Sequence, residues 1–212
     1  MDSKRLPLSS FLLLRRWRRL SEPLVVLTLV GIAAIGILAY RQHHRYKHFA
    51  VHEPGQVYRC GWVAADVMGE LVRTYQAKTV INLCRPGEMG PTRAADERAA
   101  VEEAGAQLLE LPMPDTADPH DSRIEEHIAT LKNPANYPII IHCQHGVNRT
   151  ARTIAMYEVL VHHADGEAAI HKMPRFGRDD YEALEYEFAR NFTAEYLEPT
   201  QTAEKVGDAR RE

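Results

Sequence analysis

The sequence predicts an α/β domain with a central, mostly parallel sheet flanked by helices, preceded by one N-terminal transmembrane helix. Two observations predict the domain. Short apolar runs of strand length alternate with segments of helical periodicity, and Gly or Pro residues separate many of them. Such alternation is typical of parallel sheets covered on both faces. A long stretch without charge near the start of the chain predicts the membrane span.

Residues 24–40 hold no charged side chain, and these 17 positions reach the short limit for a helix that crosses a bilayer. Trp17 and Tyr40 would mark the two membrane interfaces. A cleaved signal peptide and a buried core helix are the alternatives. More Lys and Arg precede the span than follow it closely. The sequence therefore predicts a single-pass protein with residues 1–23 in the cytoplasm and the folded domain on the non-cytoplasmic side.

Composition gives the remaining organisation: a linker at 41–54, the α/β domain at 55–195 and a polar tail at 196–212. Residues 1–50 carry nine basic against two acidic residues, a net charge of +7, which leaves −10 for the rest of a chain whose net charge is −3. An acidic domain argues against nucleic acid as a partner. Three cysteines are too few for a disulfide scaffold.

Each element of the domain has its own signal. Val63, Val67 and Leu71 keep the spacing of one helix face, and Gly105 ends a segment rich in Ala and Glu. Apolar runs mark the strands. Strands are expected at 57–61, 79–84, 107–111 and 138–142, and helices at about 63–75, 92–104, 121–132, 149–163, 166–173 and 179–192.

The loop after the last expected strand, residues 142–150, reads His-Cys-Gln-His-Gly-Val-Asn-Arg-Thr and leads into a helix. Because a loop entering a helix points backbone N–H groups into one concavity, and the helix start adds partial positive charge, this loop predicts a dianion site. Gly146 allows the tight turn, and Arg149 can grip two phosphate oxygens. Cys143 is expected to be a thiolate nucleophile in this field, with Thr150 donating its hydroxyl to the sulfur.

The pattern His-Cys-x-x-Gly-x-x-Arg-Thr resembles the signature loop of the Cys-dependent protein tyrosine and dual-specificity phosphatases. The resemblance covers roughly residues 55–165. It implies a phosphatase that forms a cysteinyl-phosphate intermediate, needs no metal or organic cofactor, and uses Cys143, Arg149 and Thr150 in catalysis. In this family a His before the nucleophile, here His142, orients the loop. The implied substrate-binding residues are Gln144, His145, Gly146, Val147, Asn148 and Arg149.

The resemblance also implies a general acid, an Asp on a loop some thirty residues before the nucleophile. Asp115 and Asp118 lie 28 and 25 residues before Cys143. Asp115 is favoured because it comes right after a strand and two prolines, and Asp118 remains open. Asp121 is more typical of a helix N-cap.

Three further residues have two interpretations each. Arg59 and Arg85 come close to strand ends and are either solvated or in contact with an anionic substrate. Cys84 ends a strand expected beside that of Cys143. Some members of the lipid-phosphatase branch carry a cysteine at the matching place that pairs with the nucleophile on oxidation. Reversible Cys84–Cys143 pairing is therefore a hypothesis, beside a plain buried thiol.

The implied partner is a phosphorylated protein or lipid, with a membrane contact through the N-terminal helix. A phosphoprotein is the first choice, and a phosphoinositide or inositol phosphate is the alternative, although the loop has no lysine. A rhodanese-like sulfur transferase and a catalytically silent phosphate-binding module that tethers a partner remain as rivals. The Arg149-Thr150 ending argues against the first rival. The intact Cys143, Arg149 and Asp115 argue against the second.

Overall fold

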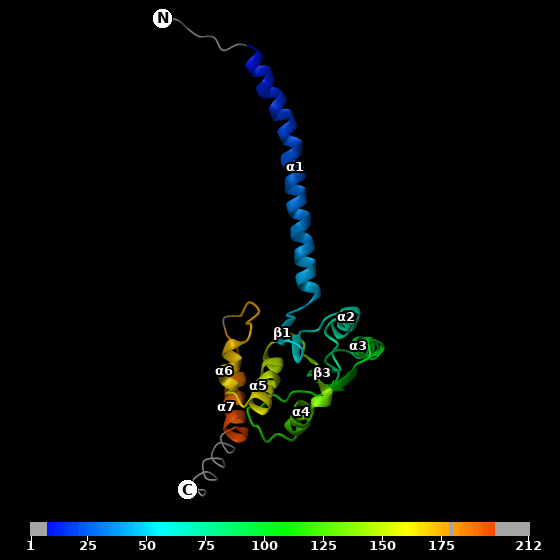
Figure 1. Ribbon diagram of the computed structural model, residues 1–212, viewed down its shortest axis with the longest axis vertical. Helices are drawn as coiled ribbons and strands as arrows, with labels where there is room; N and C mark the ends of the chain where they lie inside the picture. The colour runs from blue at the N-terminus through cyan, green and yellow to red at the C-terminus, as the bar shows by residue number, and fades with distance from the viewer. Residues whose placement is uncertain (1–7, 179, 198–212) are drawn as a thin grey trace, which may run out of the picture. The chain divides into compact units, whose positions relative to one another are not determined.

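The computed structural model describes residues 8–178 and 180–197. The chain divides into two units, residues 1–44 and residues 45–212. The first unit holds most of helix α1 (Leu8–Arg45), and the second holds the α/β domain (Figure 1).

Helix α1 has 38 residues and includes Pro23. The predicted transmembrane span at 24–40 lies inside it, and this prediction is wrong, because no helix in the described part of the chain is both long and apolar enough for a membrane crossing. Its 17 uncharged residues would extend about 26 Å as a helix, less than the hydrocarbon core of about 30 Å. The predicted single-pass localisation, with the domain on the non-cytoplasmic side, is wrong as well. The predicted membrane contact loses its support.

The sheet is mixed and has five strands in the order β1-β2-β5-β3-β4. The strands are β1 (Ala50–Glu53), β2 (Val57–Cys60), β3 (Thr79–Asn82), β4 (Gln107–Glu110) and β5 (Ile139–His142). Only the pairing of β1 with β2 is antiparallel. Strand β5 lies at the centre, with Ile140 opposite both Tyr58 and Val80. The loop that follows β5 therefore leaves from the middle of the sheet.

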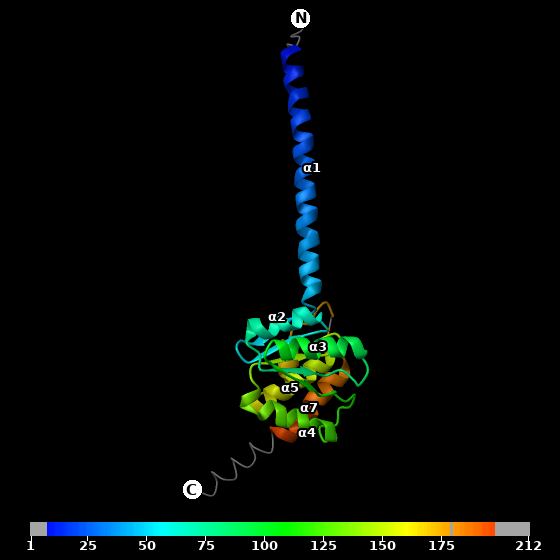
Figure 2. The ribbon, with the colours of Figure 1, turned by 90° about the vertical axis from the view of Figure 1, so that its right-hand side faces the viewer.

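Helices cover both faces, as the alternating pattern predicts. Helices α2 and α3 lie side by side (Figure 2), and their residues belong to a different core cluster from those of α4, α5 and α7. The helices are α2 (Ala65–Tyr75), α3 (Pro91–Glu103), α4 (Ser122–Lys132), α5 (Asn148–His162), α6 (Gly166–Lys172) and α7 (Ala183–Tyr196), with a short 3₁₀ turn at Pro134–Asn136. Asp121 caps α4 by accepting a hydrogen bond from the Arg123 N–H, which confirms its predicted role.

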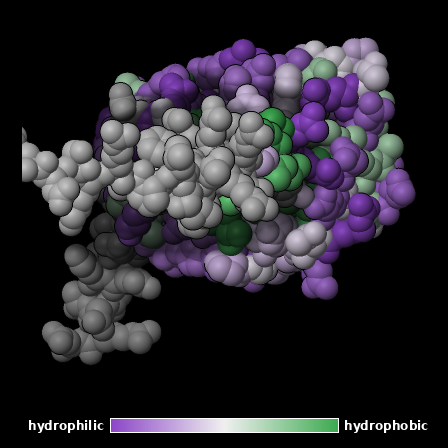
Figure 3. Space-filling view, turned by 90° about the horizontal axis from the view of Figure 1, so that it is seen from above, coloured by the Kyte–Doolittle hydropathy of each residue, from purple (hydrophilic) through white to green (hydrophobic). Residues whose placement is uncertain are grey.

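The core is split by the sheet into two clusters. Ile139 and Ile141 of β5 pack with residues of α4–α7, whereas Ile140 packs with residues of α2 and α3. All three side chains are fully buried, and each such burial is worth about 1.5–3 kcal/mol. The α/β domain turns most of its large apolar residues inward, and most of the coloured surface in Figure 3 is hydrophilic.

Residues 41–54, predicted as a linker, hold the end of α1 and strand β1. Tyr157 of α5 donates its hydroxyl to Glu53 Oε2 (2.5 Å), and His52 Nε2 lies 2.6 Å from Glu158 Oε1. These contacts tie β1 to α5, so we propose that the folded domain begins near residue 45. The predicted polar tail falls outside the described residues from 198 onward.

Candidate active site

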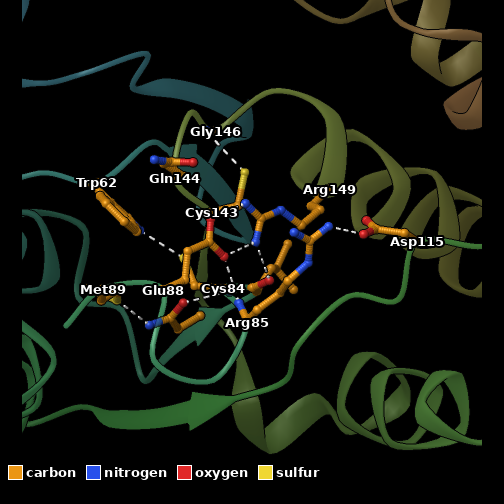
Figure 4. Close-up of polar contacts among 12 residues, drawn as sticks. Trp62, Cys84, Arg85, Glu88, Met89, Asp115, Cys143, Gln144, Gly146 and Arg149 are labelled. Carbon is orange, nitrogen blue, oxygen red and sulfur yellow. Dashed lines mark hydrogen bonds and ion pairs between the residues drawn. The ribbon is translucent and has the colours of Figure 1, made fainter. Parts of the chain in front are cut away.

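Cys143 follows β5 directly and is 3% exposed. Two donors point at its sulfur: the Gly146 N–H at 3.2 Å (Figure 4) and the Thr150 hydroxyl at 3.3 Å. Thr150 lies in the first turn of α5, so the start of this helix faces the sulfur. Both hydrogen bonds, together with the partial positive charge of the helix start, favour negative charge on sulfur.

The loop is seated tightly on the end of β2. Gly146 has φ +66°, and a Cβ at this position would lie 2.2 Å from the carbonyl oxygen of Cys60. Arg59 is fully buried and donates through Nη2 to the carbonyl groups of Gly146 (2.7 Å) and Val147 (3.4 Å). Arg59 is therefore neither solvated nor free for substrate, since it supports the loop from behind.

Two other carbonyl groups of the loop also have donors. Gln144 O accepts from Lys47 Nζ (2.7 Å) and from the Trp62 N–H (3.2 Å). His48 Nδ1 lies 2.7 Å from His145 O. Because these oxygens are bonded within the protein, their negative ends are not presented to a bound anion.

Glu88 holds the guanidinium of Arg149. Its two carboxylate oxygens each accept a hydrogen bond of 2.7 Å from Arg149, and Oε2 also accepts from the Arg85 N–H at 2.8 Å (Figure 4). Arg149 Nη1 donates further to Leu83 O (3.1 Å). The hydrogen bonds from Arg149 lower the pKa of Glu88 to about 2, and the same carboxylate raises the pKa of Arg149. No sequence pattern pointed to Glu88.

A cleft of about 220 Å³ opens at Cys143. It is lined by Asp115, Cys143, His145, Val147, Asn148, Arg149, Arg152, Arg178, Glu182, Leu184 and Glu185. Of the predicted substrate-binding residues, Gln144 and Gly146 do not line this cleft. Asp115 does, whereas Asp118 accepts from the His120 N–H in the same loop. Of the two candidate acids, Asp115 therefore lies at the cleft and Asp118 does not, and the acid assignment stays a prediction.

Arg85 is placed beside the cleft by the loop after β3. Its guanidinium forms an ion pair with the Asp115 carboxylate (Figure 4), and both side chains are at least half exposed.

Among the described residues, no three His, Cys, Asp or Glu side chains are grouped so as to hold a metal ion.

Two residues flanking the loop have contacts elsewhere. His142 is fully buried, with Nε2 3.3 Å from Glu97 Oε1 of α3. The sulfur of Cys84 accepts a hydrogen bond from Trp62 Nε1 (2.8 Å), and burial raises the pKa of this thiol to about 12. All three cysteines of the chain are free, so the Cys84–Cys143 disulfide stays a prediction.

Known proteins are similar to this chain in sequence and in fold. The family model described as "DSP-PTPase phosphatase fused to NAD+ Kinase" matches residues 42–191. The dual specificity protein phosphatase TpbA of Pseudomonas aeruginosa (strain UCBPP-PA14) is 29% identical over 116 residues, which cover 52% of this chain and 46% of TpbA. The chain thus spans about half the length of the curated relatives it matches.

Two solved structures show the same fold. PTPMT1 superposes with a TM-score of 0.56 at 20% identity, covering 73% of this chain and 99% of that one. The core catalytic domain of the PP-IP phosphatase SIW14 from S. cerevisiae has a TM-score of 0.53 at 20% identity, covering 74% and 92%. Since the family model matches well over half of the chain, the protein belongs to the DSP-PTPase family of cysteine-based phosphatases.

Proposed function

We propose that this protein hydrolyses phosphomonoesters of phosphotyrosine, phosphoserine or phosphothreonine in proteins through a cysteinyl-phosphate intermediate. One observation supports this most. The Gly146 N–H and the Thr150 hydroxyl both donate to the Cys143 sulfur, in a cleft that Asp115 and Arg149 also line. Nucleophile, anion-binding groups and acid are thus together.

The reaction would take two steps. In the first, the Cys143 thiolate attacks phosphorus, the S–P bond forms as the P–O bond to the substrate breaks, and Asp115 gives its proton to the leaving oxygen. Arg149 and the loop N–H groups hold the equatorial oxygens. In the second, water attacks phosphorus and gives a proton to Asp115, and inorganic phosphate leaves. The Thr150 hydroxyl stabilises the departing thiolate of Cys143.

Substitutions in the full chain test these roles. With p-nitrophenyl phosphate and a phosphotyrosine peptide, we expect no turnover from Cys143→Ser or Arg149→Lys. Asp115→Asn should lose on the order of 100-fold in kcat on the peptide, the range for loss of a general acid. Asp118→Asn is the matched control and should stay near wild type. Turnover by Cys143→Ser would refute the mechanism. A loss of kcat in Asp118→Asn rather than in Asp115→Asn would assign the general acid to Asp118.

An inositol phosphate or phosphoinositide is the second candidate substrate. Arg178, which no sequence pattern singled out, lines the cleft beside His145. Burial, and then the positive charges of Lys47, His48, Arg149 and Arg178, lower the pKa of His145. Of these four cations, Arg149 and Arg178 line the cleft, and Arg178 also forms an ion pair of 2.8 Å with Glu182. PTPMT1 has been solved with PI(5)P, at a TM-score of 0.55 and 17% identity, and SIW14 is named a PP-IP phosphatase.

Arg178→Gln separates the two substrate classes. If a second phosphate binds at this side of the cleft, the variant should lose at least about tenfold in kcat/KM on a short-chain phosphoinositide and little on the phosphopeptide. Arg190→Gln, which removes an exposed ion pair with Glu167, is the control. Equal losses on both substrates, or none on the phosphoinositide, would reject this second candidate.

A further inference from the structure

Arg152 lies under the loop that carries Asp115. It belongs to α5, one turn after Arg149, and its side chain is 1% exposed. Its Nη1 group donates to the carbonyl oxygens of Pro114 (2.5 Å) and Thr116 (3.4 Å), the two residues on either side of Asp115. Its Nη2 group lies 3.7 Å from Asp115 Oδ1.

We propose that Arg152 is a positioning residue for the acid: it fixes the Pro114–Thr116 backbone so that the Asp115 carboxyl stays in the Cys143 cleft. This inference rests on the proposed function, in which Asp115 protonates the leaving group. It adds a residue outside the signature loop on which that proton transfer depends.

Arg85 also contacts Asp115, but its contribution is expected to be small. The side chains of Arg85 and Asp115 are 61% and 50% exposed, and water screens such pairs. The Arg152 side chain is 1% exposed, so water screens its contacts with the loop much less. Displacing the loop would break the hydrogen bonds to the Pro114 and Thr116 carbonyl oxygens, which favours the observed position.

Helix α7 holds Arg152 in place from the other side. Glu185 is buried, and its Oε1 lies 3.6 Å from Arg152 Nε. The guanidinium also lies 5.9 Å from the ring centroid of Phe188, within cation–π distance. Because contacts within α5 and with α7 fix the position of Arg152, its hydrogen bonds also hold the Pro114–Thr116 backbone in place.

Arg152→Lys is the test, because lysine keeps the charge but loses the fork that reaches two carbonyl groups. We would measure kcat/KM for aryl phosphates with leaving groups of increasing pKa. Dinitrophenolate leaves without a proton, so its phosphate ester should lose no more than about threefold. Phenyl phosphate needs the acid and should lose on the order of 100-fold. Inhibition by inorganic phosphate, which reports the anion site at Cys143, should stay within about threefold.

The ratio between two substrates is measured within one preparation, so it does not depend on the folded fraction. Arg152→Gln, which is uncharged and tolerates burial better, is a second variant with the same expected ratio. Arg190→Lys, on an exposed pair, is the control and should keep the wild-type ratio. Equal losses for all leaving groups, or no loss, would overturn the role of Arg152.

The Asp115→Asn variant distinguishes a failure of the proposed function from a failure of the inference on Arg152. If its loss does not grow with the leaving-group pKa, Asp115 is not the acid and the proposed function must change. If its loss does grow but that of the Arg152 variants does not, only the inference on Arg152 fails.

Discussion

Replacing Glu88 by Gln tests how much activity depends on the carboxylate that holds Arg149. Two hydrogen bonds of 2.7 Å from Arg149, with a third from the Arg85 N–H, join these groups, and the Glu88 side chain is 18% exposed. They lower the pKa of Glu88 from 4.5 to about 2. At about 1.4 kcal/mol per pKa unit, this favours the charged carboxylate by about 3 kcal/mol.

Glutamine has no charge and keeps one of the two acceptors, so part of that energy is lost. We expect Glu88→Gln to lower kcat/KM for p-nitrophenyl phosphate by about 10- to 100-fold, or about 1.4–2.7 kcal/mol, and to weaken inhibition by inorganic phosphate. Because the pKa of Glu88 is lowered, its contribution is complete above about pH 4.5 and fades only as the pH falls through about 2. The loss should therefore be constant from pH 5 to 8.

Glu110→Gln removes an exposed ion pair with Arg98 and is the control, with wild-type kinetics expected. Activity of Glu88→Gln within twofold of wild type would refute the role given to Glu88. A rise in activity would mean that Glu88 competes with phosphate for Arg149.

Three more measurements follow from the structure. Gly146→Ala should abolish turnover, since its Cβ would meet the Cys60 carbonyl at 2.2 Å, and wild-type rates in this variant would contradict the loop geometry. Burial lowers the pKa of His127 from 6.5 to about 4. Between these two pH values the imidazole is therefore protonated in the unfolded chain and neutral in the folded chain. The free energy of unfolding, followed by urea titration, should then drop by about 3 kcal/mol from pH 7 to 4, and His127→Leu should remove that part of the slope, which an unchanged slope would disprove. Iodoacetamide at pH 7.5 should alkylate Cys143 and spare Cys84, whose pKa is raised to about 12, and peptide mapping that finds equal labelling would refute this.

The domain was predictable because its strands and helices carry strong periodic signals. Strand β5 reads as three consecutive isoleucines, and its central, fully buried position follows from that. Strand β1 was missed because it lies at the sheet edge and none of its residues is fully buried, so no apolar run marks it. The predicted membrane span is wrong because no helix among the described residues is both long and apolar enough to cross a membrane.

The geometry of the loop at residues 142–150 was predictable because its contacts are local in sequence. Cys143 and the donors to its sulfur lie within eight consecutive residues. Arg59, Glu88 and Arg152 were not predictable in their roles, because each acts through folding contacts with distant residues. From the sequence alone, a charged residue in a loop or helix is expected to be solvated, and only the fold shows which residues bury it.

The two residues of the proposed catalytic pair are attached to the sheet in different ways. Cys143 follows β5, which has a strand on each side, whereas Asp115 comes shortly after β4, an edge strand with one neighbour. Local unfolding starts more readily at edge strands than at the central strands of a sheet. Asp115 therefore depends on Arg152, rather than on strands at both sides, to stay in the cleft, and Arg152→Lys should speed amide exchange around Asp115 more than around Cys143.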